Sequence, residues 1–149
     1  MIAVLQRTDG VQCLVDSQEV GALKGPTLLV LLGIKNDDKD EDLEYIIKKI
    51  PELRIFEDEN GKMNKSALDI QAGLFVVSQF TLFARCRKGR RPNFMDAASY
   101  QLGKNYYDQC VEELKKTGLR VETGVYGEEM DLRFNNKGPV TILLDSREE

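Results

Sequence analysis

Short apolar runs separated by turn residues recur along the chain, which predicts a protein rich in β-strands. In the first third we expect strands at 2–7, 11–15 and 19–23. Turns at Asp9-Gly10 and at Asp16-Ser17 would separate these strands. Three strands joined by such short connections predict an antiparallel meander.

Two longer apolar runs predict the central strands of a sheet. Residues 27–34 are mostly Leu and Val after a break at Gly25-Pro26, and residues 74–83 open with four apolar residues. Runs of this kind are typical of strands buried on both faces. Shorter strands are predicted at 53–56, 120–125, 130–135 and 140–144, with a turn at 59–62.

Two segments show the period of an amphipathic helix. The first has Leu43, Ile46 and Ile50 on one face; Asn36 and Asp37 can cap it, and Pro51 ends it. The second is predicted over 97–116. The order of strands, helix, strands, helix and strands predicts an α+β fold with a mostly antiparallel or mixed, barrel-like sheet and two main helices.

Composition adds the size and class of the protein. The chain has 149 residues, of which 42% are hydrophobic and 31% charged, so we expect one globular domain spanning 1–149. No apolar run has the length of a membrane span or a targeting segment, which predicts a cytoplasmic protein with no membrane partner.

The absence of histidine removes several kinds of catalytic site. With no His, neither Ser-His-Asp nor Cys-His machinery can be built. Cys13, Cys86 and Cys110 are scattered, so they predict reduced thiols and cannot form an all-cysteine zinc site. Cys110 is expected in the core, whereas Cys86 lies among cations that favour a reactive thiolate. The acids at 57–59 lack the spacing of a calcium loop and are expected in a solvated turn. We expect no metal and no cofactor.

Polar side chains interrupt the second buried run near its end. Ser78, Gln79 and Thr81 stand among apolar neighbours, and buried polar groups need partners, so they predict a pocket. Directly afterwards, five of the seven residues at 85–91 are Lys or Arg, in a chain of net charge −4. A pocket beside a cationic rim suits a substrate with phosphates. The plain alternatives are a strand end with satisfied polar groups and a solvated turn.

Three motifs together resemble the D-aminoacyl-tRNA deacylase family. They are Ser-Gln-Phe-Thr-Leu at 78–82, Arg-Lys-Gly-Arg-Arg-Pro at 87–92 and Asn-Lys-Gly-Pro-Val-Thr at 136–141. The likeness covers essentially the whole chain. It implies a homodimeric hydrolase that cleaves the ester between a D-amino acid and the terminal ribose of tRNA, and that also accepts glycyl-tRNA.

The resemblance also implies roles for individual residues. The catalytic pocket would be lined by Ser78, Gln79, Phe80 and Thr81, with backbone N–H groups near Phe80 and Thr81 as an oxyanion hole. The phosphates of the tRNA acceptor end would contact Arg85, Arg87, Lys88, Arg90 and Arg91. Substrate binding would involve Arg7, Asn136, Gly138 and Pro139.

Within this family the Gly138-Pro139 pair is expected to select chirality. Glycine lets a ligand approach the backbone closely, and a cis X-Pro bond turns the flanking carbonyls to a similar side. Projecting from the partner subunit, these carbonyls would receive the α-ammonium group and block one direction of Cα substitution. From the sequence alone, Gly-Pro is also a common turn that starts a strand.

Two other functions fit parts of the pattern. A non-enzymatic RNA- or anion-binding domain would use the same basic loop. An esterase would use Thr81 or Cys86 as a covalent nucleophile, although neither residue has a histidine to activate it.

Overall fold

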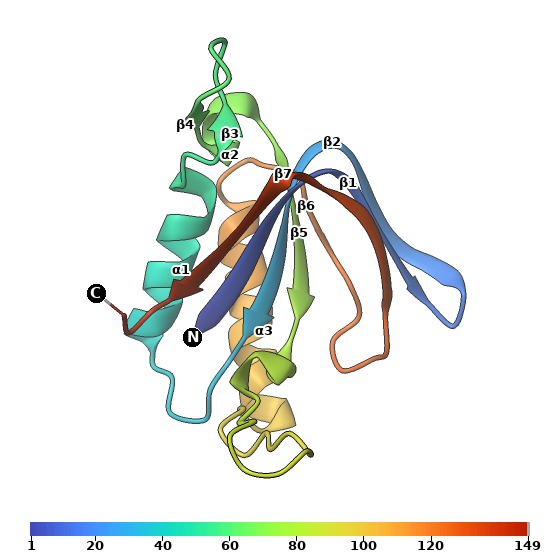
Figure 1. The fold of residues 1–149 in the computed structure, drawn as a ribbon, viewed down its shortest axis with the longest axis vertical. Helices are drawn as coiled ribbons and strands as arrows, with labels where there is room; N and C mark the ends of the chain where they lie inside the picture. Colours follow the sequence, from blue (N-terminus) through green and yellow to red (C-terminus); the bar gives the residue numbers. More distant parts are fainter. Residues whose placement is uncertain (149) are drawn as a thin grey trace.

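The computed structural model describes residues 1–148, and its main body is a five-stranded mixed sheet of order β6-β5-β2-β1-β7 (Figure 1). β1 pairs with β2 and with β7 in antiparallel orientation. β5 pairs in parallel with β2, and β6 pairs in parallel with β5. The strands are β1 (Ile2–Val15), β2 (Gln18–Gly33), β5 (Gly73–Ser78), β6 (Val121–Thr123) and β7 (Asp131–Asp145).

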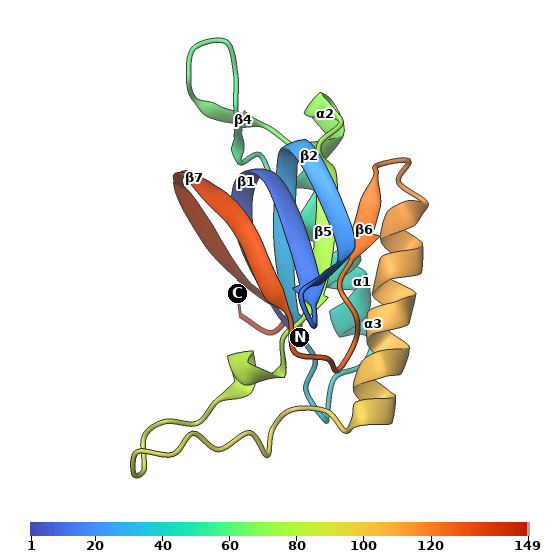
Figure 2. The same ribbon diagram turned by 90° about the vertical axis from the view of Figure 1, so that its right-hand side faces the viewer.

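Two helices, α1 (Asp40–Glu52) and α3 (Tyr100–Lys115), cover one face of the sheet (Figures 1 and 2). Alternate residues of the central strands face them, and together they form the main core. The other face carries a smaller buried cluster around Leu29 and Phe75. Both central strands are therefore buried on both faces, as their sequence predicts, and Cys110 is in the core.

The remaining elements are short. A small hairpin and one helical turn stand at the upper end of the sheet in Figure 1, and a 3₁₀ helix follows β5 at the lower end. They are β3 (Phe56–Glu57), β4 (Met63–Lys65), α2 (Ala67–Ile70) and η1 (Phe80–Phe83). None of the helices within residues 1–148 is long and apolar enough to cross a membrane.

The sheet is open, so the barrel-like expectation is wrong. β6 and β7 form its two edges and do not pair with each other. Closure would need the edge strands to meet. The strands do bend strongly, as Figure 2 shows, and this leaves a curved but unclosed surface.

Three Gly-containing positions that suggest chain breaks in the sequence lie inside three adjacent strands, where the strands bend together. Asp9-Gly10 lies inside β1, Gly25-Pro26 inside β2 and Gly138-Pro139 inside β7, and the ladders shift register there. The expected turn at Asp9-Gly10, and the expected separation of 130–135 from 140–144, are therefore wrong. Bulges let a strand bend without ending. The turn at Asp16-Ser17 is confirmed, with both residues at positive φ.

Other differences concern element ends. The second apolar run stops at Ser78 instead of continuing to 83, and α3 begins at Tyr100 behind a Ser99 cap instead of at 97. α1 begins at Asp40, not directly after Asn36 and Asp37, and ends at Glu52, one residue beyond Pro51. The strand predicted at 53–56 is found only at Phe56–Glu57, and the one predicted at 120–125 only at Val121–Thr123, because only these residues find pairing partners.

Candidate functional site

The end of β5 places the Ser78–Thr81 segment at the lower edge of the sheet. Ser78 pairs with Leu32 of β2, and the Gln79 amide donates to the Leu32 carbonyl at 2.8 Å. The chain then turns into η1, which packs against Gly33 so closely that a Cβ there would lie 3.0 Å from the Phe83 ring. A glycine in β2 thus allows η1 to close over the end of the sheet.

Two pockets lie next to this segment, and both are lined by Ser78, Gln79 and Phe80. One has a volume of 230 Å³ and the other of 190 Å³. The first continues to Ile34 and the start of α3, and the second continues along the link before β7 as far as Leu132. The predicted pocket at the end of the buried run is therefore present, with room on each side of the segment.

The four motif residues differ in their surroundings. Ser78 and Gln79 are half-buried, whereas Phe80 and Thr81 are exposed. The Thr81 hydroxyl accepts a hydrogen bond from Gln79 Nε2 at 2.5 Å and lines neither pocket. The amides of Phe80 and Thr81 begin η1, and the first N–H groups of a helix have no partner within it. Their expected role as an oxyanion hole stays a prediction.

Aromatic residues of the first pocket were not anticipated from the sequence. Tyr126 stacks edge-on with Tyr100 at 5.2 Å, and also contacts Tyr107, whose hydroxyl donates to the Val76 carbonyl at 2.8 Å. Burial raises the pKa of both Tyr107 and Tyr126 above the usual tyrosine range. The short link between β6 and β7 carries Tyr126 and Gly127 into the lining of this pocket, and the local sequence does not predict this placement.

The basic residues form an arm that leaves the body directly after η1 (Figure 2). Arg85 closes its base: the backbone pairs with Asn93, and the guanidinium binds Asp96 at 2.5 Å. The other four cations, Arg87, Lys88, Arg90 and Arg91, are exposed, as is Cys86. The arm therefore carries four exposed charges outward from the end of the sheet where the pockets lie, while Arg85 pairs at its base (Figure 2).

Gly138 and Pro139 lie on a bulge of β7. Gln6 pairs with Thr141 and Thr8 with Asn136, so four residues, 137–140, stand opposite Arg7 alone. The Gly138-Pro139 peptide bond is cis, as the family resemblance implies, and Gly138 has φ +118°.

Asn136 spans this bulge with its side-chain amide. Its Nδ2 donates to the Thr141 hydroxyl at 2.9 Å, and its Oδ1 accepts from the Val140 amide at 3.2 Å. The side chain therefore links the two ends of the bulge and fixes its width.

Arg7 holds the bulge from the other side. Its side chain is 10% exposed, and Nε donates to the Lys137 carbonyl at 3.2 Å. Nη1 donates to the Ile55 carbonyl at 3.0 Å, and Nη2 pairs with Glu57 at 3.1 Å. The guanidinium thus connects the bulge to the small β3–β4 hairpin.

Within one chain the two groups of predicted site residues lie apart. The bulge is at the level of Thr8, Thr27 and Gly73, whereas Ser78 lies five residues further along β5. That is about 17 Å at the usual rise of a strand. One subunit alone does not bring Gly138 and Phe80 together.

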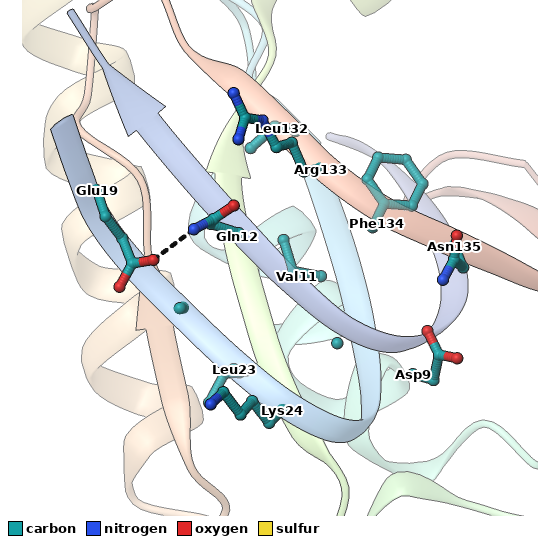
Figure 3. A pocket seen from close by; sticks show the side chains of 12 residues that line it. Asp9, Val11, Gln12, Glu19, Leu23, Lys24, Leu132, Arg133, Phe134 and Asn135 are labelled. Atoms are coloured by element: carbon teal, nitrogen blue, oxygen red, sulfur yellow. Dashed lines mark hydrogen bonds between the residues drawn. The ribbon is translucent and has the colours of Figure 1, made fainter. Parts of the chain in front are cut away.

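A larger hollow, of 590 Å³, lies elsewhere, between the β1–β2 hairpin and the first half of β7 (Figure 3). Val11, Leu23 and Phe134 give it an apolar floor, and Gln12 donates to Glu19 at 2.6 Å across its rim. It contains none of the predicted site residues. Among residues 1–148, no group of three or more His, Cys, Asp or Glu side chains is arranged to hold a metal.

Known proteins resemble this chain over nearly all of its length. The family model described as "D-Tyr-tRNA(Tyr) deacylase" matches residues 4–145. A D-aminoacyl-tRNA deacylase of Clostridium beijerinckii is 50% identical over 147 residues, covering 99% of this chain and 98% of that protein. One of Thermosipho africanus is 48% identical with the same coverage.

Solved structures show the same fold over the whole chain. The "c-Myc DNA Unwinding Element Binding Protein" superposes with a TM-score of 0.92 at 38% identity, covering 99% of this chain and 100% of that one. A "probable eukaryotic D-amino acid tRNA deacylase" gives 0.79 at 21% identity, covering 97% and 98%, which is a likeness of fold alone. With a family model and relatives of this identity spanning nearly all of its length, the chain belongs to the D-Tyr-tRNA(Tyr) deacylase family.

Proposed function

We propose that this protein hydrolyses the ester bond of D-aminoacyl-tRNA, releasing the free D-amino acid and tRNA. The observation that carries the proposal is the pair of pockets around Ser78–Phe80, flanked by the unpaired amides of η1 and by the basic arm. Nearly full-length relatives named D-aminoacyl-tRNA deacylase support the same reaction.

The chemistry would rest on orientation and on backbone donors. The chain has no histidine, and Thr81 contacts Gln79, which is not a base. An aminoacyl ester is already labile, so holding it and binding its developing oxyanion at the Phe80 and Thr81 amides can supply much of the acceleration. The neighbouring 2′-hydroxyl of the substrate would help to position water.

Chirality would be read by the bulge of a second subunit. Gly138 and Pro139 expose backbone without a long side chain. Within one subunit they lie far from the pockets at Ser78–Phe80. In a homodimer each bulge would enter the partner's site, accept the α-ammonium group and exclude L-side chains. Glycine has no side chain to exclude, so glycyl-tRNA would also be hydrolysed.

The acceptor end of tRNA would run along the basic arm. Arg87, Lys88, Arg90 and Arg91 are exposed on the arm that follows η1, in a protein whose net charge is −4. Phosphate contacts of this kind position RNA without reading its sequence. Specificity would thus come from the pockets and the bulge.

The deciding experiment compares hydrolysis of D-tyrosyl-tRNA and L-tyrosyl-tRNA by the purified protein. Selective loss of the D ester is expected. Equal hydrolysis of both esters would contradict chiral selection, and a trapped acyl-enzyme would favour a covalent esterase.

A non-enzymatic nucleic-acid-binding role is the second candidate. The basic arm favours it, and so does the likeness, at 38% identity, to a protein named for binding a DNA unwinding element. Tight RNA binding without turnover of either ester would support this candidate over the hydrolase.

A further inference from the structure

The two cations that flank the Gly138 bulge are each paired with an acid. Arg7 Nη2 lies 3.1 Å from Glu57 Oε1, and Lys137 Nζ lies 3.6 Å from Asp9 Oδ2. All four side chains line one pocket of 280 Å³ together with Gly138. The charges around the bulge therefore balance.

This balance matters because the bulge is proposed to receive a cation. An α-ammonium group at the carbonyls of Gly138 and Pro139 would approach the Arg7 guanidinium, whose Nη2 would lie only 2.9 Å from a Cβ on Gly138. Two positive charges a few ångströms apart repel each other. Arg7 is nevertheless needed at this position, since its Nε donates a hydrogen bond to the Lys137 carbonyl of the bulge.

We propose that Glu57 is a positioning residue that acts through Arg7. Its carboxylate balances the guanidinium charge and holds Nη2 at 3.1 Å, beside Gly138. The sequence suggested only a solvated turn for residues 57–59, and Glu57 is indeed 56% exposed, yet its carboxylate is tied to a nearly buried arginine. Asp9 would do the same for Lys137, more weakly, because both of those side chains are about half exposed.

The inference rests on the proposed deacylase function and is tested by Glu57→Gln, which removes the charge and keeps the size. With D-tyrosyl-tRNA at low salt we expect KM to rise about fivefold while kcat changes less than about twofold. The ratio of variant to wild-type KM should fall towards one at high salt, because salt screens partly exposed charges. Glu59→Gln is the matched control, since Glu59 lies in the same hairpin but pairs with Lys65.

An unchanged KM at low salt would overturn the inference, as would a raised KM that salt does not affect, because a purely structural loss is not screened. If Glu57→Gln does not fold, Asp9→Asn provides the same test at Lys137 with a smaller expected rise. Failure of the underlying function has a different signature: the wild-type protein would then leave D-tyrosyl-tRNA intact.

Discussion

Side chains around Gly138 fill the space that a methyl group would need. A Cβ there would lie 2.9 Å from both Arg7 Nη2 and Val140 Cγ2, on a backbone with φ +118°. We therefore expect Gly138→Ala to shift the bulge and to lower kcat/KM for D-tyrosyl-tRNA at least about tenfold, a loss of about 1.4 kcal/mol in transition-state binding. Steady-state kinetics measure this directly.

A matched control separates this crowding from backbone strain. Gly25 also has a positive φ, +82°, but a Cβ there meets nothing within 4 Å. Gly25→Ala should cost about 1–3 kcal/mol of stability while leaving kcat/KM close to wild type. Equal activity of the two variants would contradict a role for the shape of the bulge.

The Thr81 hydroxyl has one observed partner, the amide of Gln79, which cannot act as a base. Thr81→Val should therefore keep much of its activity, losing roughly tenfold, or about 1.4 kcal/mol, through disturbed hydrogen bonding. A tRNA ending in 2′-deoxyadenosine should react far more slowly with the wild-type protein.

The opposite pair of results would favour a threonine nucleophile: an inactive but folded Thr81→Val, and normal turnover of the deoxy substrate. Cys86→Ser, at an exposed position on the arm, tests the other covalent candidate in the same assay and should be fully active.

At the scale of elements, the start of α1 is tied to the C-terminal segment of the chain. Asp42 Oδ1 accepts hydrogen bonds from the Ser146 hydroxyl at 2.5 Å and from Arg147 Nε at 3.3 Å. Asp42 Oδ2 accepts one from the Lys39 amide at 2.8 Å. Burial alone raises the pKa of Asp42, but these hydrogen bonds outweigh it and hold the pKa well below its usual range.

We expect Asp42→Asn to lose about 2 kcal/mol of stability at neutral pH. A carboxyl whose folded-state pKa is lowered stabilises the fold fully above its unfolded pKa of about 3.9. This contribution is lost as the pH falls through the folded-state value. Urea unfolding of both proteins at pH 7, 5 and 3 should show the difference shrinking only at the lowest pH; a constant difference would contradict the account.

Periodicity predicted the elements that have a long, regular apolar pattern. The continuous Leu-Val run of β2 is typical of a buried strand, and the one-sided pattern of Leu43, Ile46 and Ile50 is typical of a packed helix. The sequence at Gly25-Pro26 and at Gly138-Pro139 does not define the local structure, because Gly-Pro occurs both in turns between strands and in bulges within a strand. Only pairing across β1 decides between the two, and pairing is not local.

The candidate site shows the same limit. Ser78 and Gln79 could be found because polar residues interrupt a buried run, although the same signal also pointed to Thr81, which lines neither pocket. Phe80 was expected only from the family resemblance. Tyr126 lies in the link between β6 and β7, and Glu57 lies in the two-residue strand β3. The local sequence gives no signal at either position, and both reach a pocket through tertiary packing alone.

At the scale of the whole molecule, charge is unevenly distributed. The net charge is −4, yet the arm carries five of the 21 Lys and Arg residues. Neutralising Arg90 and Arg91 together should raise KM and reduce the slope of log(kcat/KM) against log salt by about 1–2, the number of phosphate contacts removed. The measurement is a salt titration of both proteins; parallel slopes would contradict phosphate contact at these residues.

The separation of the bulge from the pockets allows a test of the shared site that needs no structure of the dimer. We expect a homodimer in light scattering, in which each site combines the Ser78–Phe80 pocket of one subunit with the Gly138 bulge of the other. Gln79→Ala would damage the pocket and Gly138→Ala the bulge. In a mixed dimer, one site then carries both defects and the other carries neither.

Unfolding the two impaired variants together and refolding them should therefore give about a quarter of wild-type activity, since about half the dimers are mixed and each has one intact site of two. Each variant refolded alone is the control and should stay at about a tenth of wild-type activity or less. If pocket and bulge of the same chain worked together, every site in every dimer would keep one defect. Mixing would then restore nothing, and the cross-subunit arrangement would be wrong even if the protein proves to be a dimer.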